Sequence, residues 1–144
     1  KNKSIYGEKM IKGGCLCGKI RYELKQEDVI SAGNCHCKDC QKATGSGKST
    51  IVYIPSKSLK INDDYKIYSV IGHEGSNVHR GFCPDCGSPI ISYVSEQPDI
   101  KFIKAGSLDD SSWLKIESSF WSDTANHWDP VDENLPTFEK NPPL

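Results

Sequence analysis

Cysteine placement limits the structures open to this sequence more than any other feature does. Seven cysteines in 144 residues fall into three tight groups, which are Cys15 and Cys17, then Cys35, Cys37 and Cys40, and finally Cys83 and Cys86. Thiolates separated by one or two residues can converge on one zinc ion, whereas loops this short strain a disulfide. An odd number also argues against a complete set of intramolecular disulfides. The spacing therefore predicts metal binding.

The seven cysteines divide naturally into a set of four and a set of three. Four ligands complete a tetrahedral zinc site, while three leave one coordination position open for chemistry. Cys83 and Cys86, followed by Gly87, form a zinc knuckle. Cys15 and Cys17 are a tighter pair that is also followed by a glycine. Combining the two pairs predicts a closed, structural zinc site that joins distant parts of the chain.

The remaining group supplies three thiolates from one short segment. We predict a second, reactive zinc site at Cys35, Cys37 and Cys40. His36 could act as a fourth ligand, which would close this site and end its reactivity. Because His36 stands between two cysteines, we expect its side chain to point away from the ion that both neighbours bind.

Composition argues against several classes of function. The length predicts one domain, and a formal net charge of −1 gives no reason to expect a polyanionic partner such as nucleic acid. No apolar run approaches the roughly 18 residues that a membrane span needs. The polar, lysine-rich residues 1–10 are interpreted as an N-terminal extension. Clustered thiols without an apolar signal-peptide core predict the reducing cytoplasm.

Short runs with strand character recur along the chain. Ile20, Tyr22 and Leu24 alternate with polar residues, which places them on one face of a strand. A helix is expected over residues 38–44, and an extended tail from Asp129 is expected to pack on the domain. Further strands are expected at residues 50–54, 65–71, 78–82, 90–94, 100–104 and 116–121. The pattern predicts an all-β, mainly antiparallel single domain with short helical turns, stapled by zinc.

Single histidines and tryptophans carry less information. His73, His79 and His127 are scattered, so surface or packing roles are expected for them. Trp121 and Trp128 bracket His127 in a segment that could cover a pocket.

Five motifs occur in order along the chain, and the three that contain cysteines are together highly specific. The five are Gly13-Gly14-Cys15-Leu16-Cys17-Gly18, Cys35-His36-Cys37-Lys38-Asp39-Cys40, the run from Arg80 to Pro89, Ala105-Gly106-Ser107-Leu108-Asp109, and the tail from Leu135 to Pro142. This set resembles the glutathione-dependent formaldehyde-activating enzyme family, whose domain is shared by a centromere protein. The likeness spans residues 11–143.

The resemblance implies a β-rich fold of the Mss4-like β-tent type, with one domain over residues 11–144 and two zinc ions per chain. It matches Cys35, Cys37 and Cys40 to the catalytic zinc of the family. It matches a second set to the structural zinc, namely Cys15, Cys17, Cys83 and Cys86. The implied activity is the reversible joining of formaldehyde and glutathione to S-hydroxymethylglutathione, a carbon–sulfur lyase reaction.

We therefore predict a zinc-dependent carbon–sulfur lyase-type enzyme that acts on a small thiol such as glutathione or on its aldehyde adduct. The alternative is a non-catalytic, zinc-stabilised interaction module, as the centromere relative suggests. A site that binds water or a small thiol favours the enzyme, and a site closed by His36 or by a partner's residue favours the module. The sequence shows no glutathione-recognition motif, so substrate-contacting residues and oligomeric state are not assigned from it.

Overall fold

The computed structural model describes residues 9–143, which form two β-sheets, one α-helix and short 3₁₀ turns. Of the predicted N-terminal extension, residues 1–8 lie outside the described part, and Met10 begins the first strand. The 3₁₀ turns are η1 (Gln26–Asp28), η2 (Ser56–Ser58), η3 (Ala105–Ser107) and η4 (Ser122–Thr124). No helix among the described residues is long and apolar enough to cross a membrane.

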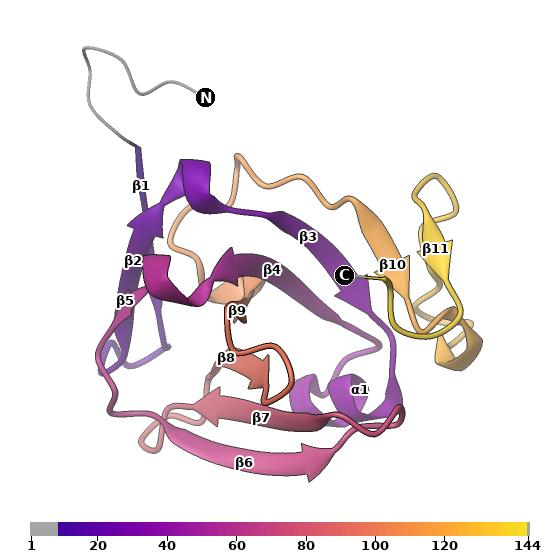
Figure 1. Cartoon of the computed structure of the whole chain (residues 1–144), viewed down its shortest axis with the longest axis horizontal. Helices are drawn as coiled ribbons and strands as arrows, with labels where there is room; N and C mark the ends of the chain where they lie inside the picture. Colours follow the sequence, from indigo (N-terminus) through magenta and orange to yellow (C-terminus); the bar gives the residue numbers. More distant parts are fainter. Residues whose placement is uncertain (1–8, 144) are drawn as a thin grey trace.

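The smaller sheet lies at one side of the molecule (Figure 1). It contains β1 (Met10–Gly14), β2 (Arg21–Lys25) and β5 (Lys60–Ile61), in the order β1-β2-β5 and all antiparallel. Ile20, Tyr22 and Leu24 are all buried, as their alternation predicted, because this face of β2 is turned to the core.

The larger sheet has eight strands in the order β11-β10-β3-β4-β9-β8-β7-β6. Their bounds are β3 (Ser31–Cys35), β4 (Ser49–Pro55), β6 (Lys66–Ile71), β7 (Asn77–Phe82), β8 (Pro89–Val94), β9 (Ile100–Lys104), β10 (Ser118–Phe120) and β11 (Thr137–Phe138). Pairing is antiparallel except that β10 runs parallel to β3 and to β11. In Figure 1, β3 and β4 cross the upper part of the molecule and β6 and β7 the lower part.

Strand β4 separates two apolar clusters. Its residues 51–54 are buried at every position because both faces of the strand are covered. Val52 and Ile54 pack in one cluster, which also holds members of the four-cysteine set. Ile51 and Tyr53 pack in the other, which holds the remaining three cysteines. Each group of cysteines is therefore built against its own part of the core.

Helix α1 (Lys38–Thr44) has the bounds that the sequence predicted. Cys37 is its N-cap, and the Cys37 Sγ accepts a hydrogen bond of 3.3 Å from the Cys40 main-chain nitrogen. Gly45 ends the helix with a φ of 74°, a left-handed conformation that glycine adopts without steric cost. Both ends of the helix are thus fixed by local chemistry.

The predicted all-β, mainly antiparallel class is confirmed. Strands β4 and β6 to β9 lie within two residues of their predicted positions, and the tail from Asp129 packs on the domain by pairing β11 with β10. The pattern missed β1, β3, β5 and β11. Two of these are only two residues long, and β1 and β3 are rich in glycine or small residues.

Candidate metal centres and adjoining cavity

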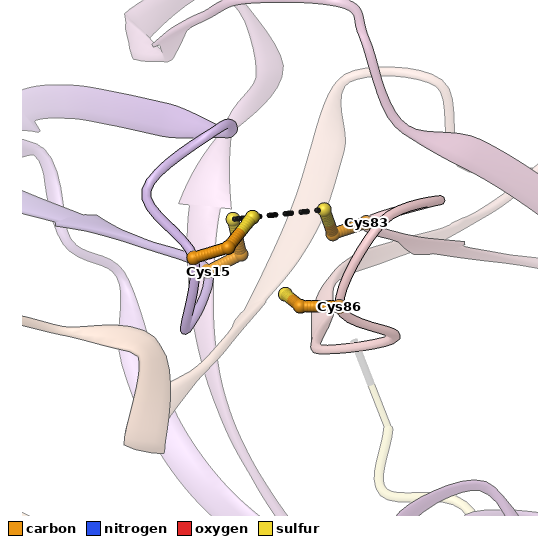
Figure 2. A group of neighbouring side chains, drawn as sticks. Cys15, Cys83 and Cys86 are labelled. Atoms are coloured by element: carbon orange, nitrogen blue, oxygen red, sulfur yellow. Dashed lines mark hydrogen bonds between the residues drawn. The ribbon is translucent and has the colours of Figure 1, made fainter.

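Four cysteine side chains meet where the turn after β1 approaches the turn after β7 (Figure 2). The Sγ atoms of Cys15, Cys17, Cys83 and Cys86 all lie within 4.8 Å of one another. The Cys15 and Cys17 sulfurs are 3.6 Å apart, and those of Cys17 and Cys83 are 3.7 Å apart. Figure 2 shows Cys15 on one chain segment facing Cys83 and Cys86 on the other.

These separations fit a tetrahedral metal site. Zinc–sulfur bonds of about 2.3 Å in a regular tetrahedron place the sulfur atoms about 3.8 Å apart. A disulfide would bring them to about 2.05 Å, and all seven cysteines are free thiols. The donor set and its spacing therefore suit zinc.

Hydrogen-bond donors surround the four sulfur atoms. The main-chain nitrogen of Ile20 donates to Cys15 Sγ at 3.2 Å, and that of Asp85 donates to Cys83 Sγ at 3.4 Å. Hydrogen bonds from the side chain and main chain of Ser88 lower the pKa of Cys86 to about 5. Such donors favour the thiolate form that a metal ion binds.

The other cysteine group is formed at the junction of β3 and α1. Cys35 is the last residue of β3, Cys37 caps the helix, and Cys40 lies in its first turn. Their Sγ atoms lie within 4.8 Å of one another, and all three residues are buried. Three sulfur donors fit a zinc site that keeps one position for a further ligand.

The three thiols differ in acidity. Hydrogen bonds from Cys35 and Cys37 lower the pKa of Cys40, and the charges of Lys104 and Arg80 act in the same direction. The hydrogen bonds that Cys35 makes with Cys37 and with Cys40 raise the pKa of Cys35. The nearby cations Lys104 and Arg80 therefore favour the thiolate form of Cys40.

His36 does not join this cluster. Its ring nitrogens do not lie within 4.8 Å of all three sulfurs, although the residue is fully buried. Its carbonyl accepts hydrogen bonds from Gln41 Nε2 at 2.8 Å and Thr124 Oγ1 at 2.9 Å. Burial lowers the pKa of His36, which favours the neutral ring. The residue therefore anchors the segment through its main chain, and the geometry favours the open three-cysteine arrangement.

A cavity of about 420 Å³ borders the three-cysteine group. Its apolar wall is formed by Tyr53, Phe102, Phe120 and Trp121. The rings of Tyr53 and Phe102 meet edge-on, with centroids 4.9 Å apart. Its volume lies in the range of small-molecule sites, and apolar walls with a few polar groups are typical of them.

The rim of the cavity combines the β6–β7 turn with the C-terminal tail. The Asn141 main-chain nitrogen donates to Glu74 Oε1 at 3.1 Å, and Trp121 Nε1 donates to Asn141 Oδ1 at 2.7 Å. His73 Nε2 lies 3.5 Å from Asp39 Oδ1, and the His73 ring packs against Trp121 at 5.6 Å. Segments from both halves of the chain therefore enclose the cysteines.

Trp121 is held in an unusual backbone conformation. Its φ of 62° is the only positive φ at a non-glycine residue within residues 9–143. A bulky residue in the left-handed region is strained, and such strain clusters at functional sites. The Trp121 nitrogen donates to the Lys140 carbonyl at 3.1 Å, and the Lys140 ammonium lies 4.9 Å from the centre of the indole ring.

Two cationic side chains line the cavity beside the sulfur atoms. Arg80 Nη2 lies 3.9 Å from Cys40 Sγ. Lys104 Nζ donates to the buried Ser92 Oγ at 3.1 Å. Burial lowers the pKa of Lys104, while the charge on Cys40 opposes that shift.

The spacing of the seven cysteines predicts the same two groups that the structure brings together, but no sequence pattern assigned residues to the cavity. Trp121 lines the cavity, whereas His127 and Trp128 are exposed and do not. His73 was expected in a surface or packing role; it is exposed and packs against Trp121, and it also lies at the cavity rim.

Arg80 and Lys104 were also missed as cavity residues, although each carried a signal. Arg80 begins the motif from Arg80 to Pro89, which contains Cys83 and Cys86. Lys104 lies two residues after Phe102 in β9, so both are on the same face of that strand.

Comparison with known proteins assigns the family. The family model described as glutathione-dependent formaldehyde-activating enzyme matches residues 10–124. No curated protein matches the sequence. A solved protein from Rhodobacter sphaeroides has a similar fold, with a TM-score of 0.54 and 18% sequence identity, over 68% of this chain and 87% of that chain. Because the family match covers most of the sequence, this chain belongs to the glutathione-dependent formaldehyde-activating enzyme family.

Proposed function

We propose that this protein is a zinc-dependent enzyme of the carbon–sulfur lyase type that joins a small thiol to an aldehyde and reverses that reaction. The observation that carries the proposal is the three-cysteine group at the wall of a cavity of about 420 Å³. The family name supports glutathione and formaldehyde as the substrates, with S-hydroxymethylglutathione as the product.

Cys35, Cys37 and Cys40 would hold the catalytic zinc. The structural zinc would be held by the other set, Cys15, Cys17, Cys83 and Cys86. When bound, zinc in the three-thiolate site would hold a substrate thiol as its thiolate at neutral pH.

The residues of the cavity would prepare the reaction. The apolar rings of Tyr53, Phe102 and Phe120 line the cavity together with the three cysteines and would limit the access of water to the reacting atoms. In the forward direction a carbon–sulfur bond forms between the thiol sulfur and the carbonyl carbon. The thiol proton ends on the carbonyl oxygen as a hydroxyl hydrogen, and the reverse reaction returns it.

The test measures turnover above the uncatalysed rate, because formaldehyde reacts with thiols unaided. Exchange NMR with ¹³C-formaldehyde and glutathione gives the rate of adduct formation with and without zinc-loaded protein. We expect exchange to accelerate in proportion to protein concentration. Isothermal titration with glutathione and related thiols, paired with zinc quantification, measures binding separately.

The matched control is Cys37→Ser, which removes one sulfur from the three-cysteine group and leaves the four-cysteine set intact. This variant should keep one metal ion and return exchange to the buffer rate. If the wild-type protein neither accelerates exchange nor binds any thiol of the panel, the lyase proposal is wrong. The zinc-stabilised interaction module would then describe the protein better.

The seven free thiols also bear on the cellular compartment in which this protein works. Thiol clusters persist in reducing compartments, and we infer a cytoplasmic location on that basis. To check this inference, the protein is isolated under anaerobic conditions and the oxidation state of its cysteines is measured by thiol titration.

A further inference from the structure

The two arginines of the sequence differ in whether a carboxylate lies beside the guanidinium group. Arg21 donates from Nη1 and Nη2 to the two carboxylate oxygens of Asp109, at 3.0 and 2.5 Å. No carboxylate of residues 9–143 lies within 4.0 Å of the Arg80 guanidinium. Its Nε is buried without a hydrogen-bond partner, and its Nη2 lies 3.9 Å from Cys40 Sγ. A partly buried cation of this kind is stabilised by negative charge nearby.

Lys104 repeats the pattern on β9, which β8 separates from the β7 strand of Arg80. The hydrogen bond from Nζ to Ser92 Oγ is with a neutral group, and no described carboxylate lies within 4.0 Å of the ammonium. Lys104 and Arg80 line the same cavity as Cys35, Cys37 and Cys40. The two cations therefore share one source of negative charge.

The acidic side chains of the cavity are engaged elsewhere. Asp39 lies against His73, and Glu74 accepts from the main chain of Asn141. Glu96 accepts from Asn77, both from its main-chain nitrogen and from Nδ2. Glu74 and Glu96 are exposed, which places them at the rim. None of the three neutralises the cations.

The formal charges at the three-cysteine site show how Arg80 and Lys104 change its net charge. Three thiolates and a divalent metal ion leave one net negative charge. With Lys104 protonated, Arg80 and Lys104 together turn this into one net positive charge. A neutral fourth ligand leaves that positive charge uncompensated, whereas an anionic ligand cancels it in a site where burial strengthens electrostatic interactions.

We propose that Arg80 and Lys104 are specificity-determining residues, which make the three-cysteine site select ligands that bind as anions over neutral ligands. This inference rests on the proposed function, because it concerns the ligand of the same metal ion. It concerns the charge of the ligand at that metal ion, and it does not require a carboxylate elsewhere in the substrate. The two residues position charge and are not themselves bonded to the reacting atoms.

The test compares three probes on cobalt-loaded protein, followed by the visible absorption of cobalt. Azide and 2-mercaptoethanol bind as anions, whereas imidazole binds as a neutral ligand. In Arg80→Met and Lys104→Met, we expect the Kd of both anionic probes to rise by about tenfold or more, since each variant loses one nearby charge. The Kd of imidazole should change by less than about twofold.

Three further variants separate charge from packing. Arg80→Lys and Lys104→Arg keep the charge and should retain most of the anion affinity. Lys101→Met removes a charge from the same strand as Lys104, but Lys101 lies over the Tyr93 ring and does not line the cavity. It should bind all three probes as the wild-type protein does.

Two results would overturn the inference. If the Kd of all three probes rises equally and cobalt is lost, the two cations only support the metal site. If the affinities for all three probes are unchanged in both methionine variants, the charges of Arg80 and Lys104 do not affect ligand binding at the three-cysteine site. These outcomes are independent of the proposed reaction, since a protein that fails to accelerate adduct exchange can still prefer azide to imidazole through Arg80 and Lys104.

Discussion

The sulfur atoms of Cys17 and Cys83 lie 3.7 Å apart, although 66 residues separate them in the sequence. One belongs to the turn after β1 and the other follows β7, so this contact joins the smaller sheet to the larger one. A metal ion bound there would restrain both sheets, and its binding free energy would contribute directly to folding. The three-cysteine group lies within six residues and has no comparable long-range span.

Replacing Cys83 with serine should therefore lower thermal stability far more than replacing Cys37 does. We expect Cys83→Ser to lose about 3 kcal/mol or more, which is roughly a 10 °C fall in melting temperature for a chain of this length. Cys37→Ser should keep most of its stability. Calorimetry on both zinc-loaded variants gives the comparison, and similar losses in the two would mean that both metal sites are structural.

The two sites should also release metal at different rates. Four thiolates leave a chelator no position to enter, whereas three leave one. Under mild chelation, one equivalent of zinc per chain should leave early and a second should remain. A colorimetric zinc indicator follows the release over time. A single phase of two equivalents, or only one equivalent in total, would contradict this division into four and three.

Gly87→Ala should destabilise the four-cysteine turn by about 1 kcal/mol, because its φ of 78° lies in the left-handed region. No atom lies within 4 Å of the position that an added Cβ would take, so backbone conformation alone sets the cost. Gly106→Ala is the matched control, since its surroundings are equally open and its φ is not left-handed. Denaturant unfolding of the zinc-loaded proteins measures both, and equal values for the two variants would refute the argument.

Tyr22 should make stability fall at alkaline pH. Burial raises the pKa of Tyr22 to about 12, while the unfolded chain titrates near 10. The unfolded state therefore loses this proton first, and the stability that Tyr22 contributes below pH 10 is lost as the pH rises toward 12. Tyr22→Phe should flatten this decline and cost about 1 kcal/mol at neutral pH through the lost hydrogen bond to Ser107.

The control for this experiment is Tyr68→Phe, because Tyr68 is 68% exposed on β6. Denaturant unfolding from pH 8 to 11 gives the free energy of each variant. Parallel pH profiles for the wild type and Tyr22→Phe would show that another group causes the alkaline decline.

Local chemistry explains which parts of the fold were predictable. The helix bounds follow from Cys37 at the N-cap and Gly45 at the end, and β4 follows from a β-branched and aromatic run. Strand β3 reads Ser-Ala-Gly-Asn-Cys, which has no strand propensity of its own. It becomes a strand because β4 and β10 pair with it on either side, and such pairing is invisible in a local pattern.

The same distinction applies to the candidate site. Metal-ligand spacing is local, so all seven cysteines could be grouped from the sequence. The cavity residues are not local, because His73 comes from a turn, Arg80 from β7 and Lys104 from β9. Only the register of the larger sheet brings them to Cys40, and no spacing rule contains that register.

Because Asn141 lies at the cavity rim, the cavity is completed only late in synthesis. During synthesis, the four-cysteine set is complete once residue 86 has left the ribosome. The cavity wall still lacks Phe120 and Trp121 at that stage, and its rim lacks Asn141. A nascent chain therefore carries the thiols of Cys35, Cys37 and Cys40 without their full cover while about 100 further residues, up to Asn141, are made, and during this time oxidants and competing metal ions reach them freely.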